Sequence, residues 1–366
     1  MHDNDDMLLA AELLRRSRAL APAVLLRAEP LQGDASGRRY VRLHLQGAPV
    51  ASVVLMLLRS ARGPIARGGE HIDQDQAFVS LAPFLRRHAL NVPQVLVDGR
   101  DRGALLVEDV GGVPLWHFTF DRLTAEGRAI KERLGQDAAL ILYKKAARSL
   151  AVLQSIRPAP ECVAFQRSFE LEEYRTEARR FIDHYMIPNS FPAPEIEAVE
   201  RGILRICEAV AAHPRCLVYR DFIPWNIHIA PDGELAFIDF QDMLVGSFAY
   251  DIVSLIHDRD GDFALGAAVC SRILECFMEL RGLTPSFYRS YHEALLQRYF
   301  RLVGQFRLLS ERLGNPVYNG WIPGCFRRIG SSLAALPEMA EVLAVLAKAR
   351  PEVRRGAEES WLPAAR

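Results

Sequence analysis

Lysine is scarce in this sequence. Only four of the 45 basic residues are lysines, and none of these lies within residues 1–130. Any cation required in the first third of the chain must therefore be an arginine, whose planar guanidinium differs from a lysine ammonium. Long apolar runs are also missing: the best stretch, Ala51–Leu58, falls well short of the roughly 20 residues that span a membrane. We therefore expect no membrane insertion.

Cysteine pairing and excess charge are absent as well. The six cysteines form no C-x-x-C pair and no Cys/His metal-ligand spacing, so we interpret them as reduced thiols of a cytosolic protein. The chain starts with acidic residues before its first apolar run, the reverse of a secretory signal. Acidic and basic residues both number 45, which gives no indication of a nucleic-acid-binding protein. We expect a cytoplasmic monomer with two domains or lobes in its 366 residues.

Alternating apolar runs separated by turn residues predict an antiparallel β region near the N-terminus. The expected strands are Val24–Leu31, Arg38–Leu45, Val50–Leu58, Val92–Val97 and Ala104–Glu108. Helical patterns occupy Met7–Leu20, with Asp5 and Asp6 as cap candidates, and Asp75–Ala89, which Pro83 is expected to kink or to start. The Gly/Arg-rich stretch Arg59–Gly69 is expected to be a loop.

The pattern becomes mainly helical from about residue 120. The strongest helical candidates are Asp137–Ile156, Glu170–Met186, Glu195–Ala212, Ser286–Leu313 and Met339–Lys348. A β patch interrupts them at Cys216–Tyr219, Ile227–Ala230 and Glu234–Ile238. The sequence therefore predicts an α+β fold with two lobes: a small antiparallel β-rich lobe over residues 1–110 and a larger, mainly helical lobe over residues 111–366.

The densest polar cluster lies in and beside this β patch, in YRDFIPWN (219–226) and FIDFQD (237–242). Four residues separate Asp221 from Asn226, and Asp239 follows Asn226 by thirteen. Because two β runs and a turn fill that gap, we expect a hairpin to bring Asn226 and Asp239 close together. Phosphoryl transfer requires a carboxylate that accepts the acceptor's hydroxyl proton, and oxygen ligands for Mg²⁺. The alternative is that these residues only cap a loop and a turn.

These two segments resemble the catalytic loop and the metal-binding segment of the aminoglycoside/choline phosphotransferase superfamily, relatives of the protein kinases. The resemblance implies a protein-kinase-like bilobal fold and ATP as phosphoryl donor. It also implies that Asp221 is the catalytic base and that Asn226 and Asp239 are Mg²⁺ ligands. Asp251 is implied as a brace beneath the loop, although an acid at a helix N-terminus is the ordinary alternative. Tyr219 replaces the histidine that usually helps to hold this loop.

Within the superfamily, the chain most resembles the bacterial amino-sugar kinases of cell-wall recycling, which phosphorylate the anomeric hydroxyl of N-acetylmuramate and N-acetylglucosamine. The segments that carry this resemblance are GDASGRRY (33–40), GALLVEDVG (103–111), DFQD (239–242) and GQFRL (304–308). The chain is thus predicted to be an ATP-dependent kinase of an N-acetylated amino sugar. The alternatives are a kinase for another small acceptor, such as choline or an aminoglycoside, and a nucleotide-binding pseudokinase.

The nucleotide is expected under the first β-turn, where Gly33, Ser36 and Gly37 allow backbone N–H groups to approach phosphate oxygens. By resemblance, adenine is expected to meet the backbone near Glu108 and Val110. The third strand lacks the lysine that anchors phosphate in ordinary kinases. Arg39 is our first choice for a replacement, with Arg42 and Arg59 as the other candidates and a solvated surface position as the alternative for each.

The acceptor is expected next to the metal-binding segment, where Gln241 and Asp242 can bond sugar hydroxyls or an N-acetyl group. Arg298 or Arg307 is a candidate for binding a substrate carboxylate, against the alternative of a surface or ion-paired arginine. Trp225 is expected either to stack on a substrate ring or to pack in the core.

Overall fold

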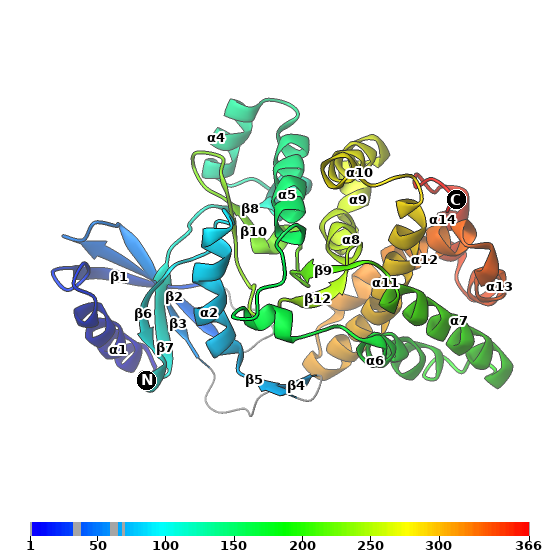
Figure 1. Cartoon of the computed structure of the whole chain (residues 1–366), viewed down its shortest axis with the longest axis horizontal. Coiled ribbons are helices and arrows are strands. Elements are labelled where there is room, and N and C mark those ends of the chain that lie inside the picture. The colour runs from blue at the N-terminus through cyan, green and yellow to red at the C-terminus, as the bar shows by residue number, and fades with distance from the viewer. Residues whose placement is uncertain (1, 32–37, 59–64, 68–69, 366) are drawn as a thin grey trace. The chain divides into compact units, whose positions relative to one another are not determined.

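The computed structural model describes residues 2–31, 38–58, 65–67 and 70–365 (Figure 1). The chain forms two units. Unit 1 consists of Met1–Val113, Glu161–Val163 and His228–Asp242, and unit 2 consists of Pro114–Pro160, Ala164–Ile227 and Met243–Arg366. The hairpin segment His228–Asp242, which the sequence pattern places in the C-terminal lobe, therefore belongs to unit 1.

Unit 1 is built on a five-stranded antiparallel sheet in the order β1-β2-β3-β7-β6. In this sheet Tyr40 lies opposite Met56, and Arg42 lies opposite Val54. The predicted antiparallel β lobe is confirmed. The strands are β1 (Val24–Leu31), β2 (Arg39–Gln46), β3 (Ser52–Leu57), β6 (Val95–Gly99) and β7 (Ala104–Glu108).

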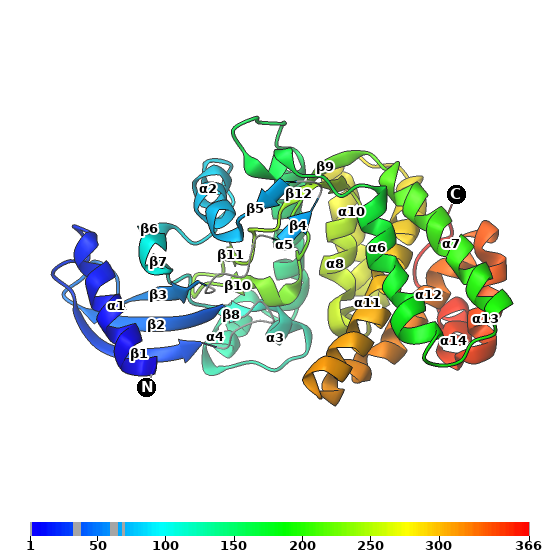
Figure 2. The ribbon, with the colours of Figure 1, turned by 90° about the horizontal axis from the view of Figure 1, so that it is seen from below.

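Helix α1 (His2–Arg16) covers one face of this sheet (Figure 2). Leu13 and Leu14 of α1 join a buried cluster with Val41, Leu43 and other apolar residues of β2, β3, β6 and β7. The helix begins at His2, so the prediction that Asp5 and Asp6 cap it is wrong. Both carboxylates lie inside the first turns instead, where they face the positive end of the helix dipole.

Helix α2 (Gln74–Arg87) begins after Asp73, whose side chain accepts a hydrogen bond from the N–H of Asp75 at 2.8 Å. Pro83 lies inside the helix, which starts nine residues earlier, so Pro83 does not mark its beginning. The expected loop at Arg59–Gly69 lies mostly outside the described residues. Its described part, β4 (Ile65–Arg67), is a strand that pairs with β5 (Glu70–Ile72).

The hairpin segment is attached to the α2–β6 region of unit 1. Strand β10 (Ile227–Ile229) lies between β11 (Leu235–Phe237) and β8 (Val113–Pro114). The side-chain amide of Asn91 donates to the Leu235 carbonyl at 3.0 Å, and the Phe237 N–H donates to the Asn91 carbonyl at 2.8 Å. The rings of Phe78 and Phe240 stack with centroids 4.6 Å apart. These contacts fix Asp239 and its neighbours relative to α2.

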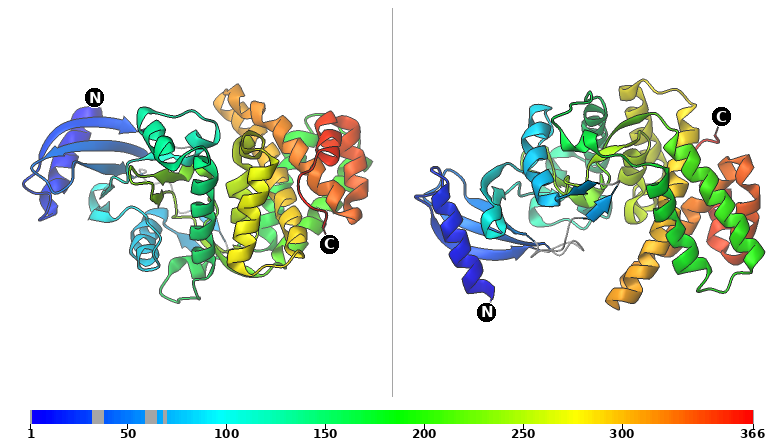
Figure 3. Two further views of the ribbon diagram at one scale, coloured as in Figure 1. Left: turned by 90° about the horizontal axis from the view of Figure 1, so that it is seen from above. Right: turned by 60° about the horizontal axis from the view of Figure 1, so that its bottom comes forward.

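Unit 2 is mainly helical, as predicted. Figure 2 shows α6 and α7 side by side, and Figure 3 shows the C-terminal helices α12, α13 and α14 grouped together. No helix in the described ranges combines the length and the apolar character that spanning a bilayer requires. The elements are α3 (Leu115–Thr119), α4 (Ala125–Leu134), α5 (Ala138–Gln154), α6 (Leu171–Phe181, continued by a π-helical turn, Ile182–Met186), α7 (Ala193–Ala211), β9 (Arg215–Val218), β12 (Leu244–Ser247), α8 (Tyr250–His257), α9 (Gly261–Leu265), α10 (Ala267–Arg281), α11 (Phe287–Leu313), α12 (Ile322–Ala335), α13 (Ala340–Ala349) and α14 (Pro351–Glu358).

The close packing of α11 on α6 depends on Gly304. A Cβ at this buried position would overlap the backbone carbonyl of Arg180 on α6, which cannot rotate away as a flexible side chain can. We therefore expect Gly304→Ala to lower the free energy of unfolding by about 1–3 kcal/mol, the usual cost of overpacking. Denaturant unfolding measures this loss. Gly320→Ala is the matched control, because a Cβ there enters open space; an equal loss in both variants would contradict the prediction.

Candidate active site

The loop Tyr219–Asn226 of unit 2 connects β9 to β10, and hydrogen bonds within the loop hold it together. The carbonyl oxygen of Asp221 accepts hydrogen bonds from the Ile223 N–H at 2.9 Å and from the side-chain nitrogen of Asn226 at 3.0 Å. The second bond fixes the orientation of the Asn226 amide, so that its oxygen points away from the Asp221 carbonyl. The Asp221 side chain is half-buried, whereas Asn226 is buried.

Asp251, at the start of α8, lies beneath this loop and is completely buried. Its two carboxylate oxygens accept the backbone N–H groups of Tyr219 and Arg220, at 2.6 Å and 3.0 Å. Burial raises the pKa of Asp251 to about 8, although the N–H of Tyr219 and the charge of Arg298 act to lower it. One side chain therefore holds the two residues that precede Asp221.

The backbone before Asp221 is held in an uncommon conformation. Arg220 has a φ of +77°, which is unfavourable for a bulky residue. Its buried guanidinium donates to Glu177 of α6 at 3.0 Å and lies over the Phe169 ring, 5.8 Å from the centroid. The side chain of Arg220 thus ties the strained position to the helical core.

A second, largely covered cation, Arg301, also interacts with this loop and was not singled out by the sequence patterns. Arg301 of α11 lies 3.3 Å from Glu177 and donates to the Tyr250 hydroxyl at 2.8 Å. Burial acts to lower the pKa of Arg301, but Glu177 and Asp221 raise it above its ordinary value. No local motif marks Arg301 or Glu177 as partners, because their contact joins α11 to α6, whose residues lie more than 100 positions apart in the chain.

The other half of the predicted constellation lies in unit 1. Asp239 follows β11 by two residues and has a φ of +67°. One of its carboxylate oxygens accepts the side-chain amide of Gln241 at 2.6 Å. Asp242 accepts the side-chain amide of Gln74, the first residue of α2, at 2.9 Å. In this polar cluster Gln241 contacts Asp239 and Asp242 contacts α2, and the role of both residues in acceptor binding stays a prediction.

The residues predicted to bind the nucleotide lie in three different places. Gly33, Ser36 and Gly37 lie outside the described residues. Glu108 ends β7, and its N–H donates to the Gln94 carbonyl at 2.8 Å; Val110 follows in the connector. Arg39 is half exposed and donates to Asp6 of α1 at 2.8 Å and 3.1 Å, so the structure ties it to α1.

Arg42 forms an ion pair with Asp109, at the point where the chain leaves the sheet after β7. It donates to both carboxylate oxygens of Asp109, at 2.6 Å and 3.1 Å, and Ser52 donates to the same carboxylate at 2.7 Å. Burial raises the pKa of Asp109, but hydrogen bonds from Arg42 and Ser52 outweigh this and hold it below its usual value. The carboxylate also accepts the Gly111 N–H at 3.0 Å, which fixes the connector beside Glu108.

The three remaining acceptor candidates differ in exposure. Trp225 is 37% exposed and contacts the rings of Trp116 and His117. Arg298 is buried, lies 4.0 Å from Asp258 and sits over the Tyr250 ring. Two of its guanidinium nitrogens, Nε and Nη1, have no hydrogen-bond partner in the described part of the chain.

Arg307 lies farther along α11 and is partly exposed. Its guanidinium lies 3.7 Å from Glu311, one turn later on the same helix. No contact in the described residues joins Arg307 to the loop around Asp221.

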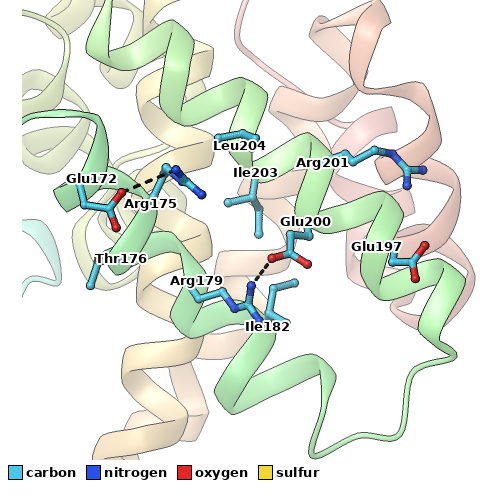
Figure 4. Close-up of a pocket in the computed structure, with 10 residues that line it drawn as sticks. All are labelled: Glu172, Arg175, Thr176, Arg179, Ile182, Glu197, Glu200, Arg201, Ile203 and Leu204. Atoms are coloured by element: carbon cyan, nitrogen blue, oxygen red, sulfur yellow. Dashed lines mark hydrogen bonds and ion pairs between the residues drawn. The ribbon is translucent and has the colours of Figure 1, made fainter.

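A separate pocket of about 440 Å³ lies between α6 and α7 (Figure 4). None of the predicted site residues lines it. Arg179 of α6 pairs with Glu200 of α7 across the groove, and Arg175 lies 3.6 Å from Glu172 on the same helix, α6. Cations and carboxylates alternate along its walls, so the pocket has no charge preference that would indicate a phosphate-binding site.

The two predicted metal ligands each carry an oxygen donor of the kind that Mg²⁺ prefers. No group of three histidine, cysteine or carboxylate side chains that could hold a metal is found in the described ranges. The amide oxygen of Asn226 and the carboxylate of Asp239 are hard donors, and Mg²⁺ is typically held by one or two such groups together with phosphate oxygens and waters.

Comparison with known proteins agrees with this chemistry. The model of the phosphotransferase enzyme family matches residues 27–283, more than half of the chain. The N-acetylmuramate/N-acetylglucosamine kinase of Pseudomonas aeruginosa is 27% identical over 336 residues, which cover 89% of this chain and 88% of that protein.

Solved structures show the same fold. A choline/ethanolamine kinase family protein from Mesorhizobium loti superposes with a TM-score of 0.57 at 16% identity, covering 93% of this chain and 99% of that one. An aminoglycoside phosphotransferase with bound ADP gives a TM-score of 0.57 at 15% identity, covering 88% and 96%. The predicted protein-kinase-like fold is therefore confirmed.

Proposed function

The chain belongs to the phosphotransferase enzyme family, and we propose that it transfers the γ-phosphoryl group of ATP to the anomeric hydroxyl of an N-acetylated amino sugar. Curated relatives in four bacterial species carry the name N-acetylmuramate/N-acetylglucosamine kinase and are 24–28% identical to this chain. The observation that carries the proposal is the loop around Asp221, which is closed on itself and held from below by Asp251.

The proposed reaction begins with the acceptor hydroxyl bound at Asp221. As the hydroxyl oxygen forms a bond to the γ-phosphorus, the bond from that phosphorus to the β–γ bridging oxygen breaks, and ADP leaves with the electron pair. The Asp221 carboxylate takes the hydroxyl proton. In such a reaction most of the catalysis comes from positioning and charge stabilisation, and this explains why Asp251 and Arg220 hold the loop so firmly.

Mg²⁺, when bound, offsets the negative charge that develops on the transferred phosphoryl group and on ADP. In the proposal, Asn226 and Asp239 supply its protein ligands. With the ion bound, the bond from the Asn226 amide nitrogen to the Asp221 carbonyl would hold the amide that ligates it, and Gln241 would orient the Asp239 carboxylate.

The proposed acceptor site uses groups of two kinds. Trp225, with its partly exposed ring, offers an apolar face to a sugar ring. Gln241 and Asp242 offer hydrogen bonds to hydroxyl or N-acetyl groups, and the unmatched nitrogens of Arg298 favour this arginine over Arg307 as the partner of a lactyl carboxylate. Because the reaction consumes ATP, we extend the proposal to a cytoplasmic location.

The direct test is ADP release from purified protein with Mg·ATP and a panel of acceptors. We expect turnover with N-acetylmuramate or N-acetylglucosamine and none with choline, aminoglycosides or no acceptor. Phosphorus NMR of the product identifies a phosphate on the anomeric carbon. Turnover restricted to choline or an aminoglycoside would contradict the sugar assignment while leaving the phosphoryl-transfer mechanism intact.

One observation favours a cationic acceptor as the second candidate. Trp116, His117, Phe120 and Trp225 form an aromatic cluster, and aromatic faces attract quaternary ammonium groups. Arg122 already lies over the Trp116 ring, 5.4 Å from its centroid, and so occupies part of this surface. For this reason we rank choline below the amino sugars, and the same acceptor panel decides between them.

A further inference from the structure

Strand β2 directs its side chains to two faces of the unit 1 sheet, because successive residues alternate. Val41 and Leu43 are buried against α1, so the odd-numbered positions face that helix. Arg39 belongs to the same series, and its ion pair with Asp6 of α1 is the result. Arg39 is therefore directed at α1 and away from the opposite face of the sheet.

The even-numbered positions of this segment point to the other face. Arg38, directly before β2, is in this series with Tyr40 and Arg42. The Arg38 side chain is only 3% exposed and donates to the Asp75 carboxylate at 2.7 Å. Since Asp75 lies in the first turn of α2, Arg38 joins the sheet to the N-terminus of that helix.

Arg38 also lies within electrostatic reach of Asp239. Burial acts to lower the pKa of Arg38, but Tyr40, Asp75 and Asp239 together raise it above its usual value. The neighbouring polar contact agrees with this placement, because Gln74, next to Asp75, donates to Asp242. Arg38 thus belongs to the polar cluster around the proposed metal ligand.

No lysine is available on the adjoining strand. β3 reads SVVLML, and its residue opposite Tyr40 is Met56, which is 1% exposed. Ordinary kinases place a lysine on this strand, hold it with a carboxylate from the following helix, and use it to bind phosphate. In this chain, Arg38, directly before β2, and Asp75 of α2 form such a cation–carboxylate pair.

We infer that Arg38 is the residue that binds the phosphates of ATP, and that Asp75 positions it. A guanidinium has five N–H donors in a planar fork, so it can donate to a carboxylate and to phosphate oxygens at the same time. The inference rests on the proposed function only in requiring ATP as a ligand; it does not depend on the identity of the acceptor.

The test compares binding of Mg·ATP with binding of adenosine by calorimetry. Arg38→Met is expected to weaken ATP binding by about tenfold to a hundredfold, the usual effect of losing a hydrogen bond to a charged group. Adenosine, which lacks phosphate, is expected to bind as it does to the wild type. Arg38→Lys keeps the charge without the fork and is expected to give an intermediate loss. Arg27→Met, which removes an exposed arginine of β1, is the control.

Three outcomes would overturn the inference. An equal loss of ATP and adenosine affinity in Arg38→Met would show a structural role for Arg38. A selective loss of ATP affinity in Arg39→Met, with Arg38→Met unaffected, would assign the role to Arg39. A wild-type protein that binds ATP no more tightly than adenosine has no phosphate anchor at all. Failure of the acceptor panel alone would reject the sugar and leave the comparison of ATP with adenosine valid.

Discussion

Replacing Asp221 with asparagine is expected to lower kcat with the preferred acceptor by about 10²–10⁴-fold, the range that general-base catalysis contributes. Asparagine has nearly the same shape, and the loop is held through the Asp221 backbone carbonyl, which the substitution leaves in place. The variant therefore loses the proton acceptor and keeps the loop. Steady-state ADP release with saturating ATP and acceptor measures the effect.

The affinity for Mg·ATP distinguishes a catalytic loss from a general one. We expect Asp221→Asn to bind Mg·ATP about as well as the wild type, and its unfolding transition to be unchanged. Asp232→Asn is the matched control, because it removes an exposed acid from the turn between β10 and β11 and is expected to keep full activity. An Asp221→Asn protein with more than a tenth of wild-type kcat would rule out this residue as the base.

The secondary structure of the site could be predicted from the sequence because it rests on local signals. The alternation of apolar residues at Val24–Leu31 and Ala104–Glu108 predicts strands with the bounds that the structure has. The Pro-Asp-Gly turn between two apolar runs predicts the hairpin that carries Asp239. In each case the information lies within about ten residues of the element itself.

Local sequence signals do not decide whether Arg38 or Arg39 is the better candidate for binding phosphate. Arg38 directly precedes β2 and Arg39 begins it, and alternation alone says only that they face opposite sides of the sheet. The sequence does not reveal which side is covered by α1, since this depends on packing between residues far apart in the chain. The ion pair between Arg39 and Asp6 settles this point, and it joins residues 33 positions apart.

The ion pairs of Glu177 with Arg220 and Arg301 in unit 2 were missed for the same reason. Glu177, Arg220 and Arg301 come from three separate segments, and nothing in their local sequence marks them as partners. A charged residue on an amphipathic helix is normally solvated, so its pattern predicts an exposed position. The pairing of these charges follows from the packing of separate segments in the folded chain, which the local sequence does not predict.

The network around Arg328 is expected to have the largest effect on stability. Arg328 of α12 and Asp262 of α9 are 3% and 2% exposed, and the guanidinium Nε lies 3.1 Å from both Asp262 oxygens. The same arginine donates to Asp260 at 2.9 Å, and His257 lies 2.7 Å from Asp262. Arg328→Met leaves the buried Asp262 carboxylate without its cation, so we expect the free energy of unfolding to fall by about 3–5 kcal/mol at neutral pH.

The pH dependence of this loss identifies its cause. Burial acts to raise the pKa of Asp262, but Arg328 and His257 outweigh it and hold the pKa well below its usual value. Asp262 therefore contributes its full stabilisation above its unfolded pKa of about 4, and this contribution declines progressively as the pH falls from that value toward the lower pKa of the folded state. The difference between wild type and Arg328→Met in denaturant unfolding should accordingly be largest near pH 7 and smaller near pH 3.

Arg327→Met provides the control for this prediction, because it removes the adjacent arginine of the same helix. Arg327 pairs with Glu359 at 2.9 Å, and both side chains are partly exposed to solvent. Exposed ion pairs contribute about 0–1 kcal/mol, so this variant should unfold at nearly the wild-type denaturant concentration at every pH. A loss in Arg328→Met that stays constant between pH 7 and pH 3 would instead assign the effect to lost packing against the rings of Phe263 and Tyr299, over which the guanidinium lies.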